Sequence, residues 1–71
     1  MAKMIDGREL LPPEPLELTL GALDALGDDE ELILLIYCQP LPLFNILKRN
    51  GYVWRERVLD DGTHEVSIRK G

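Results

Sequence analysis

The sequence feature that most constrains the fold is an unbroken apolar run, Leu32–Cys38, in the middle of the chain. A strand with one face in water alternates apolar and polar residues. An unbroken run is instead typical of a strand that is covered on both faces or has parallel neighbours. The run is also far shorter than the about 20 apolar residues that a membrane-spanning helix needs. We therefore predict that it forms the central strand of a sheet.

Two proline-rich segments, Pro12–Pro15 and Pro40–Pro42, mark the expected starts of two helices. Proline cannot donate the hydrogen bond that a central strand requires, but its fixed φ suits the first turn of a helix, where an N–H has no partner anyway. The first helix is therefore predicted to begin near Pro13, and the second to open at Pro40–Pro42.

Apolar residues recur at helical spacing behind each of these segments. They are Leu16, Leu20, Leu23 and Leu26 in the first helix, and Leu43, Phe44, Ile46 and Leu47 in the second. Residues three or four apart share one face of a helix, so each helix should bury one face. We expect Gly27 to form a left-handed cap after the first helix, and Gly51 to end the second.

The chain closes with an expected β-hairpin. Tyr52–Leu59 and Thr63–Lys70 alternate in the manner of strands, and Asp60-Asp61-Gly62 between them contains the Asp-Gly pair of tight turns. With a short first strand at Lys3–Asp6, the element order is β-α-β-α-β-β. This order predicts an α+β fold, a two-layer sandwich with a four-stranded mixed sheet and two helices on one face, in a single domain over residues 1–71.

Composition excludes several classes of function. Thirteen acidic residues against eight basic ones give a net charge of −5, which opposes nucleic-acid binding. A single cysteine and a single histidine form neither a disulfide framework nor a recognisable metal site, and nothing in the sequence indicates a cofactor. The start of the chain carries no long apolar segment, so we expect a soluble, cytoplasmic protein that does not bind membranes.

The candidate site follows from the topology. If the first two strands are parallel, their carboxyl ends and both helix starts lie at one edge of the sheet. This edge gathers the candidate binding residues Pro12, Pro13, Glu14, Pro15, Cys38, Gln39, Pro40, Leu41 and Pro42. Phosphate is a weak prediction here, because the prolines remove N–H donors and Glu14 adds negative charge.

Cys38 is the candidate nucleophile of the chain, because a thiol just before a helix can be exposed and activated. A lone cysteine at the end of an apolar strand is more often a small buried hydrophobe, and both interpretations stay open. His64 lies on the last strand and is interpreted as a surface or edge residue with no expected proximity to Cys38. Trp54 and Tyr52 are expected to be packing residues.

Two stretches of the sequence resemble the TusA-like (SirA-like) sulfur carriers. They are Leu11-Pro12-Pro13-Glu14-Pro15-Leu16 and Leu35-Ile36-Tyr37-Cys38-Gln39-Pro40. The resemblance implies the β-α-β-α-β-β fold and, in those carriers, a Cys-Pro-x-Pro motif whose cysteine holds a persulfide at the start of the first helix. Proline stands at the matching position here, Pro12, so the persulfide chemistry does not transfer to that position.

The sequence is more similar to a neighbouring bacterial family, domain of unknown function 2249. The similarity rests on Pro12-Pro13-Glu14-Pro15-Leu16-Glu17, on Pro40-Leu41-Pro42-Leu43-Phe44 and on the later Trp54. It implies the same fold and brings no established reaction. The chain departs from the family pattern where a His-Asp pair typically precedes the second proline segment, because Cys38-Gln39 stands there.

These observations favour a non-catalytic protein-interaction or regulatory module of the bacterial cytoplasm, a monomer that contacts an unidentified protein partner through the proline-rich edge. The alternative is a sulfur or redox carrier in which Cys38 acts as a relocated persulfide thiol. Binding of a small ligand at the same edge is a third possibility, for which the sequence selects no ligand.

Overall fold

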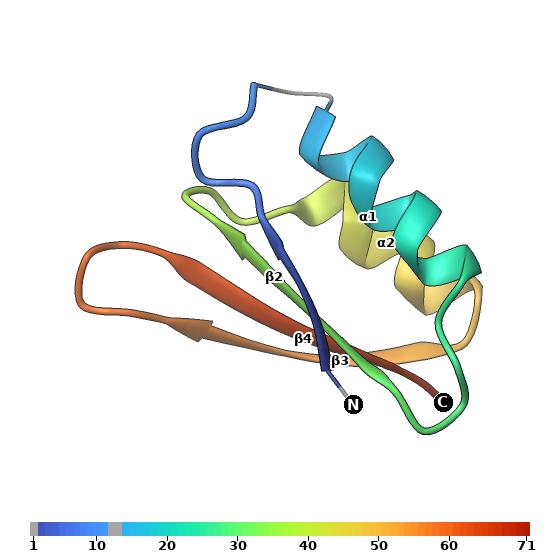
Figure 1. The fold of residues 1–71 in the computed structure, drawn as a ribbon. Helices are drawn as coiled ribbons and strands as arrows, with labels where there is room; N and C mark the ends of the chain where they lie inside the picture. Colours follow the sequence, from blue (N-terminus) through green and yellow to red (C-terminus); the bar gives the residue numbers. More distant parts are fainter. Residues whose placement is uncertain (1, 12–13) are drawn as a thin grey trace.

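The chain folds into two layers, a four-stranded sheet and two helices that lie on one of its faces (Figure 1). The computed structural model describes residues 2–11 and 14–71. The elements are β1 (Ala2–Asp6), α1 (Glu14–Asp24), β2 (Glu31–Ile36), α2 (Leu41–Arg49), β3 (Tyr52–Val58) and β4 (His64–Lys70). The strand order is β1-β2-β4-β3; β1 and β2 are parallel, and β4 is antiparallel to both of its neighbours. The predicted α+β sandwich with a mixed sheet is confirmed.

Strand β2 lies inside the sheet, as its apolar run predicts, and it is buried on both faces for different reasons. Leu32 and Leu34 face the helices and are 0% and 1% exposed. Leu35 faces away from the helices yet is also buried, between Asp6 of β1 and Glu65 of β4 in the strand register. On the side of the sheet opposite the helices, Leu35 is therefore covered by neighbouring side chains of the sheet itself and not by further helices.

The core consists of apolar side chains from both layers. It comprises Leu23, Leu26, Leu43 and Leu47 from the helical layer, and Leu32, Leu34, Val66 and Ile68 from the sheet. Burial of each such side chain stabilises the fold by about 1.5–3 kcal/mol relative to exposure. The Trp54 ring stacks on Phe44 of α2 with ring centroids 5.3 Å apart, so the expected packing role of Trp54 is confirmed.

The expected left-handed cap at Gly27 is wrong. Helix α1 ends at Asp24, and the N–H groups of Ala25 and Leu26 donate to carbonyls three residues back, at 3.2 and 3.1 Å. Gly27 is not among the glycines with positive φ, and its N–H donates to Oε1 of Glu30 at 2.7 Å. The Glu30 carboxylate thus accepts the hydrogen bond of the Gly27 N–H, and the turn does not use the left-handed glycine that the sequence suggested.

The other two glycine turns follow the prediction. Gly51 has φ +80° directly after α2, and Gly62 has φ +88° in the hairpin. Leu59 N–H donates to the Thr63 carbonyl at 2.8 Å and Gly62 N–H to the Leu59 carbonyl at 3.0 Å. The hairpin therefore uses a three-residue loop, Asp60 to Gly62, whose last residue is left-handed.

Replacing Gly62 and Gly21 by alanine should have opposite effects on stability. A Cβ at either position would meet no atom of the described residues within 4 Å, so packing does not distinguish the two sites. Gly62→Ala places a side chain in the left-handed region and should destabilise by about 1–2 kcal/mol. Gly21→Ala lies within α1 and should stabilise by about 0.5–1 kcal/mol. Urea denaturation of the two variants measures both changes, and a loss of stability in both would contradict the assignment.

Candidate functional site

The candidate site lies at the edge of the sheet where β1 and β2 end and both helices begin (Figure 1). We call its described residues, Glu14, Pro15 and Cys38–Pro42, the proline edge. Pro12 and Pro13, which the sequence also assigns to this site, lie outside the described residues. Glu14 is exposed and Pro15 is buried, while Cys38, Gln39, Leu41 and Pro42 are exposed and Pro40 is half-buried. The parallel pairing of β1 with β2 brings the two segments together as the topology predicts.

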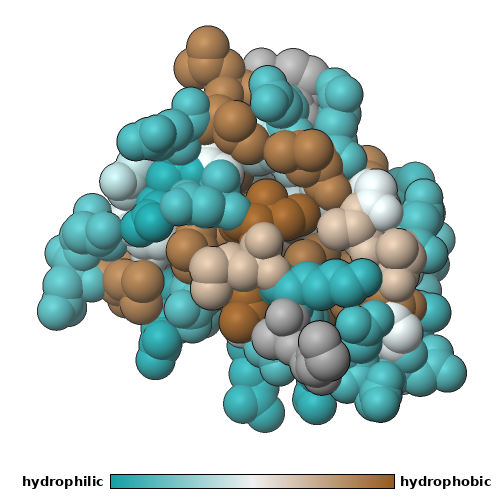
Figure 2. All heavy atoms as spheres, in the orientation of Figure 1, coloured by the Kyte–Doolittle hydropathy of each residue, from teal (hydrophilic) through white to brown (hydrophobic). Residues whose placement is uncertain are grey.

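An apolar hollow joins the two segments. Its volume is about 330 Å³, and its lining residues are Pro15, Leu16, Leu34, Ile36, Cys38, Gln39, Pro40, Pro42 and Leu43. Figure 2 shows apolar side chains gathered in the middle of the face seen there, bordered by hydrophilic ones. The size is at the small end of the range for ligand pockets, and it suits one large side chain or a small apolar molecule.

Exposed apolar side chains stand around this end of the sheet. Leu11 is 79% exposed, Tyr37 56%, Leu41 57% and Val58 60%. Leu41 begins α2 and Val58 ends β3, whereas Leu11 lies in the segment before α1 and Tyr37 in the bend after β2. Exposed apolar side chains that gather in one place are typical of contact surfaces.

A polar cluster ties the loop after β2 to the β3–β4 hairpin. The Gln39 amide Nε2 donates to Oε1 of Glu56 at 2.8 Å, and Nδ1 of His64 lies 2.8 Å from Oε2 of the same carboxylate. The Glu56 and His64 side chains are each 20% exposed. His64 is also the register partner of Ile36, the last residue of β2. Both oxygens of Glu56 are therefore occupied, and they hold the loop that carries Cys38.

This cluster was not predicted from the sequence. Glu56, His64 and Ile36 share the helix-facing side of the sheet, which strand alternation can indicate, but their meeting depends on a register that the sequence does not specify. The interpretation of His64 as an edge residue unrelated to the loop of Cys38 is corrected, because Glu56 and Gln39 connect them.

Cys38 is exposed, so its interpretation as a small buried hydrophobe is wrong. The apolar run continues to residue 38 in the sequence, but β2 ends at Ile36, and both Tyr37 and Cys38 lie in the bend that follows. The chain thus presents a solvent-accessible thiol at the rim of the apolar hollow.

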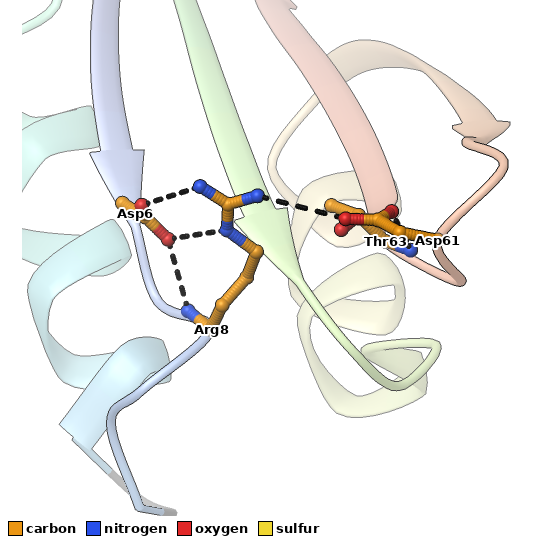
Figure 3. Close-up of polar contacts among 4 residues, drawn as sticks. All are labelled: Asp6, Arg8, Asp61 and Thr63. Atoms are coloured by element: carbon orange, nitrogen blue, oxygen red, sulfur yellow. Dashed lines mark hydrogen bonds and ion pairs between the residues drawn. The ribbon is translucent and has the colours of Figure 1, made fainter.

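Arg8 forms an ionic bridge across the end of β2 on the open side of the sheet (Figure 3). Its Nε and Nη2 donate to the two carboxylate oxygens of Asp6 at 2.9 and 2.8 Å, and its backbone N–H also donates to Asp6 at 3.2 Å. Its Nη1 lies 3.9 Å from a carboxylate oxygen of Asp61 in the hairpin loop. The bridge joins the end of β1 to the hairpin loop.

The pKa values of both carboxylates are lowered, that of Asp6 by the bridge and that of Asp61 mainly by Thr63. The hydrogen bonds from the Arg8 side chain, followed by the one from its backbone, lower the pKa of Asp6 to about 2. Contacts of Asp61 with the side chain and then the backbone N–H of Thr63, with a smaller effect of Arg8, lower the pKa of Asp61. Both carboxylates therefore stay charged well below neutral pH.

Other site types find no support in the described residues. Within residues 2–11 and 14–71, no group of three or more His, Cys, Asp or Glu side chains is arranged to hold a metal ion. No helix in that part of the chain is long and apolar enough to cross a membrane.

Comparison with known proteins places this fold in a defined class. The structure matches the crystal structure of a SirA-like protein from Desulfitobacterium hafniense with a TM-score of 0.82 and 25% sequence identity, over 96% of this chain and 95% of that chain. The protein therefore has a SirA-like fold. The model of the family of uncharacterised conserved proteins DUF2249 matches residues 4–70, and the chain belongs to this family. No curated protein matches the chain.

The pKa of Asp6 provides a direct test of the Arg8 bridge. In the folded protein the carboxyl should titrate near pH 2, and in Arg8→Gln it should move up toward the ordinary value of 3.8. Because the folded pKa is the lower one, the bridge stabilises the fold above about pH 4, and this contribution is lost as the pH falls toward 2. Carbon-detected NMR titration of Asp6 measures the shift, and an unchanged midpoint in Arg8→Gln would refute the bridge.

Proposed function

We propose that the protein is a non-catalytic protein-interaction or regulatory module whose contact surface is the proline edge. The observation that carries the proposal is the apolar hollow, with the exposed Leu41 side chain lying between Pro40 and Pro42 of its lining. A protein interface typically has an apolar centre that excludes water and a polar rim that orients the partner. The hollow and Leu41 supply the centre, and Glu14 and Gln39 supply the rim.

The rigidity of the surface supports this function. Gln39 is held by Glu56, and Pro15, Pro40 and Pro42 restrict the backbone around the hollow. A surface that is already ordered loses less conformational entropy when a partner binds. The side chain that enters the hollow is expected to be apolar, because carbon atoms dominate its lining.

A triple variant tests the contact surface. Glu14→Lys, Gln39→Ala and Leu41→Asp together should reduce partner binding at least about tenfold, since they remove the polar rim and place a charge at the centre. The measurement is affinity capture with the immobilised protein, followed by direct titration of the recovered partner. Leu18→Asp, Asp24→Lys and Asn45→Ala form a matched control, because these residues are exposed and lie outside the hollow. Equal binding by the two triple variants and the unaltered protein would count against the surface.

A second candidate function rests on the exposure of Cys38, which a carrier thiol requires. In this alternative, the Cys38 thiolate attacks the terminal sulfur of a donor enzyme's cysteine persulfide. The new sulfur–sulfur bond forms on Cys38 while the donor's sulfur–sulfur bond breaks, and the donor cysteine leaves as a thiolate. Transfer to an acceptor thiol follows the same chemistry.

Mass spectrometry distinguishes the two functions. After incubation with a cysteine desulfurase and cysteine, a sulfur carrier gains the mass of one sulfur atom on Cys38, and Cys38→Ser does not. A chain that stays unmodified while a known carrier in the same reaction is loaded rejects the carrier function. If the protein is an interaction module, Cys38 should stay unmodified, and the Cys38→Ser variant should still bind the partner.

A further inference from the structure

The face of the sheet opposite the helices carries a second hollow, separate from the proline edge. Its volume is about 510 Å³, and it is lined by Glu31, Val53, Trp54, Arg55, Ser67 and Arg69. Residues of β2, β4 and β3 contribute, and neither helix of the described residues lies on this side of the sheet (Figure 1). The short Ser67 side chain lies between the longer ones, so the middle of this face is recessed.

Two arginines at this hollow have no counter-ion in the described part of the chain. Arg55 and Arg69 are exposed, and neither forms an ion pair with any residue of 2–11 or 14–71. Of the other arginines on this side of the sheet, Arg57 is bonded to Glu65 at 3.0 Å and Arg8 to Asp6 at 2.8 Å. The protein carries a net charge of −5, so two unpaired guanidinium groups side by side are a local exception to its acidic surface.

The strand register fixes the spacing of these two arginines. Arg55 is opposite Ser67, and Arg69 is opposite Val53, so Arg55 and Arg69 are diagonal neighbours on adjacent strands. Diagonal neighbours on one face of an antiparallel pair lie about 7 Å apart. Alternate residues of an extended chain are also about 7 Å apart and point to the same side.

We propose that this face binds an extended acidic segment of a partner protein, whose carboxylates at alternate positions pair with Arg55 and Arg69. A guanidinium group binds a carboxylate through two parallel hydrogen bonds, which gives the pairing a defined direction. Val53, which is 48% exposed, lies next to this pair and accepts an apolar side chain of the same segment. Glu31, also at the hollow, repels a further acidic residue beyond Arg69 and so limits the acidic stretch.

This surface is independent of the proposed function, because it lies on the other face of the sheet from the apolar hollow. An experiment can therefore reject either proposal and leave the other standing. Together they would let the protein hold two different partners at once.

Two short peptides of identical composition test the spacing. Acetyl-Ser-Glu-Val-Glu-Ser-amide carries its carboxylates at alternate positions, whereas acetyl-Ser-Glu-Glu-Val-Ser-amide carries them on opposite sides of an extended chain. In proton–nitrogen NMR spectra the first peptide should shift the amide signals of Val53, Arg55, Ser67 and Arg69, and should bind about fivefold more tightly than the second. Added salt should weaken this binding, because the contacts are exposed ion pairs.

Charge-matched double variants test the residues. Arg55→Gln with Arg69→Gln should weaken binding of the first peptide by about tenfold. Lys48→Gln with Arg49→Gln removes the same charge from the end of α2, in the other layer, and should leave binding unchanged. All four side chains are exposed, so both variants are expected to fold, and circular dichroism checks this.

Three results would overturn the proposal. The first is equal binding of the two peptides, and the second is equal weakening in the two double variants, which would show attraction to net charge alone. The third is a concentration-dependent dimer in sedimentation that Arg55→Gln with Arg69→Gln abolishes, because the face would then belong to a second copy of the chain.

Discussion

The structure depends on the parallel pairing of β1 with β2 around the buried apolar side chains of β2. Parallel pairing requires a crossover, and α1 provides it on the side where Leu32 and Leu34 need cover. The same pairing directs both strand ends to one edge, from which α1 and α2 start. The apolar hollow lies between these two helix starts, and prolines from both of them line it.

Much of this arrangement was predictable from local sequence signals. Proline placed the helix starts, the unbroken apolar run placed the central strand, and Asp-Gly placed the hairpin. The alternation expected of the last strand agrees with the burial of Val66 and Ile68, two residues apart on one face. These signals succeeded because each reflects the conformational preference of one residue or the period of one element, and neither needs knowledge of the rest of the chain.

The features that sequence reasoning missed all depend on contacts between distant segments. Glu56 joins Gln39 to His64 only because a particular register brings β3 and β4 to the end of β2. Gly27 adopts an ordinary conformation because Glu30 folds back to satisfy its N–H. Cys38 is exposed because hydrogen bonding in β2 stops at Ile36, although the apolar run continues. In each case one tertiary contact, or its absence, outweighed a local preference.

The arginines of β3 have a consequence for how the protein behaves at high concentration. Strand β3 is an edge strand of the sheet. The unpaired backbone groups of an edge strand can bind a strand of another molecule and so begin aggregation. If β3 of a second molecule paired antiparallel with this strand near full overlap, Arg55 would lie opposite Arg55 or Arg57 of that molecule. Like charges directly opposite each other destabilise such a pair. The side chains of this edge strand therefore disfavour fibre-like growth by strand addition.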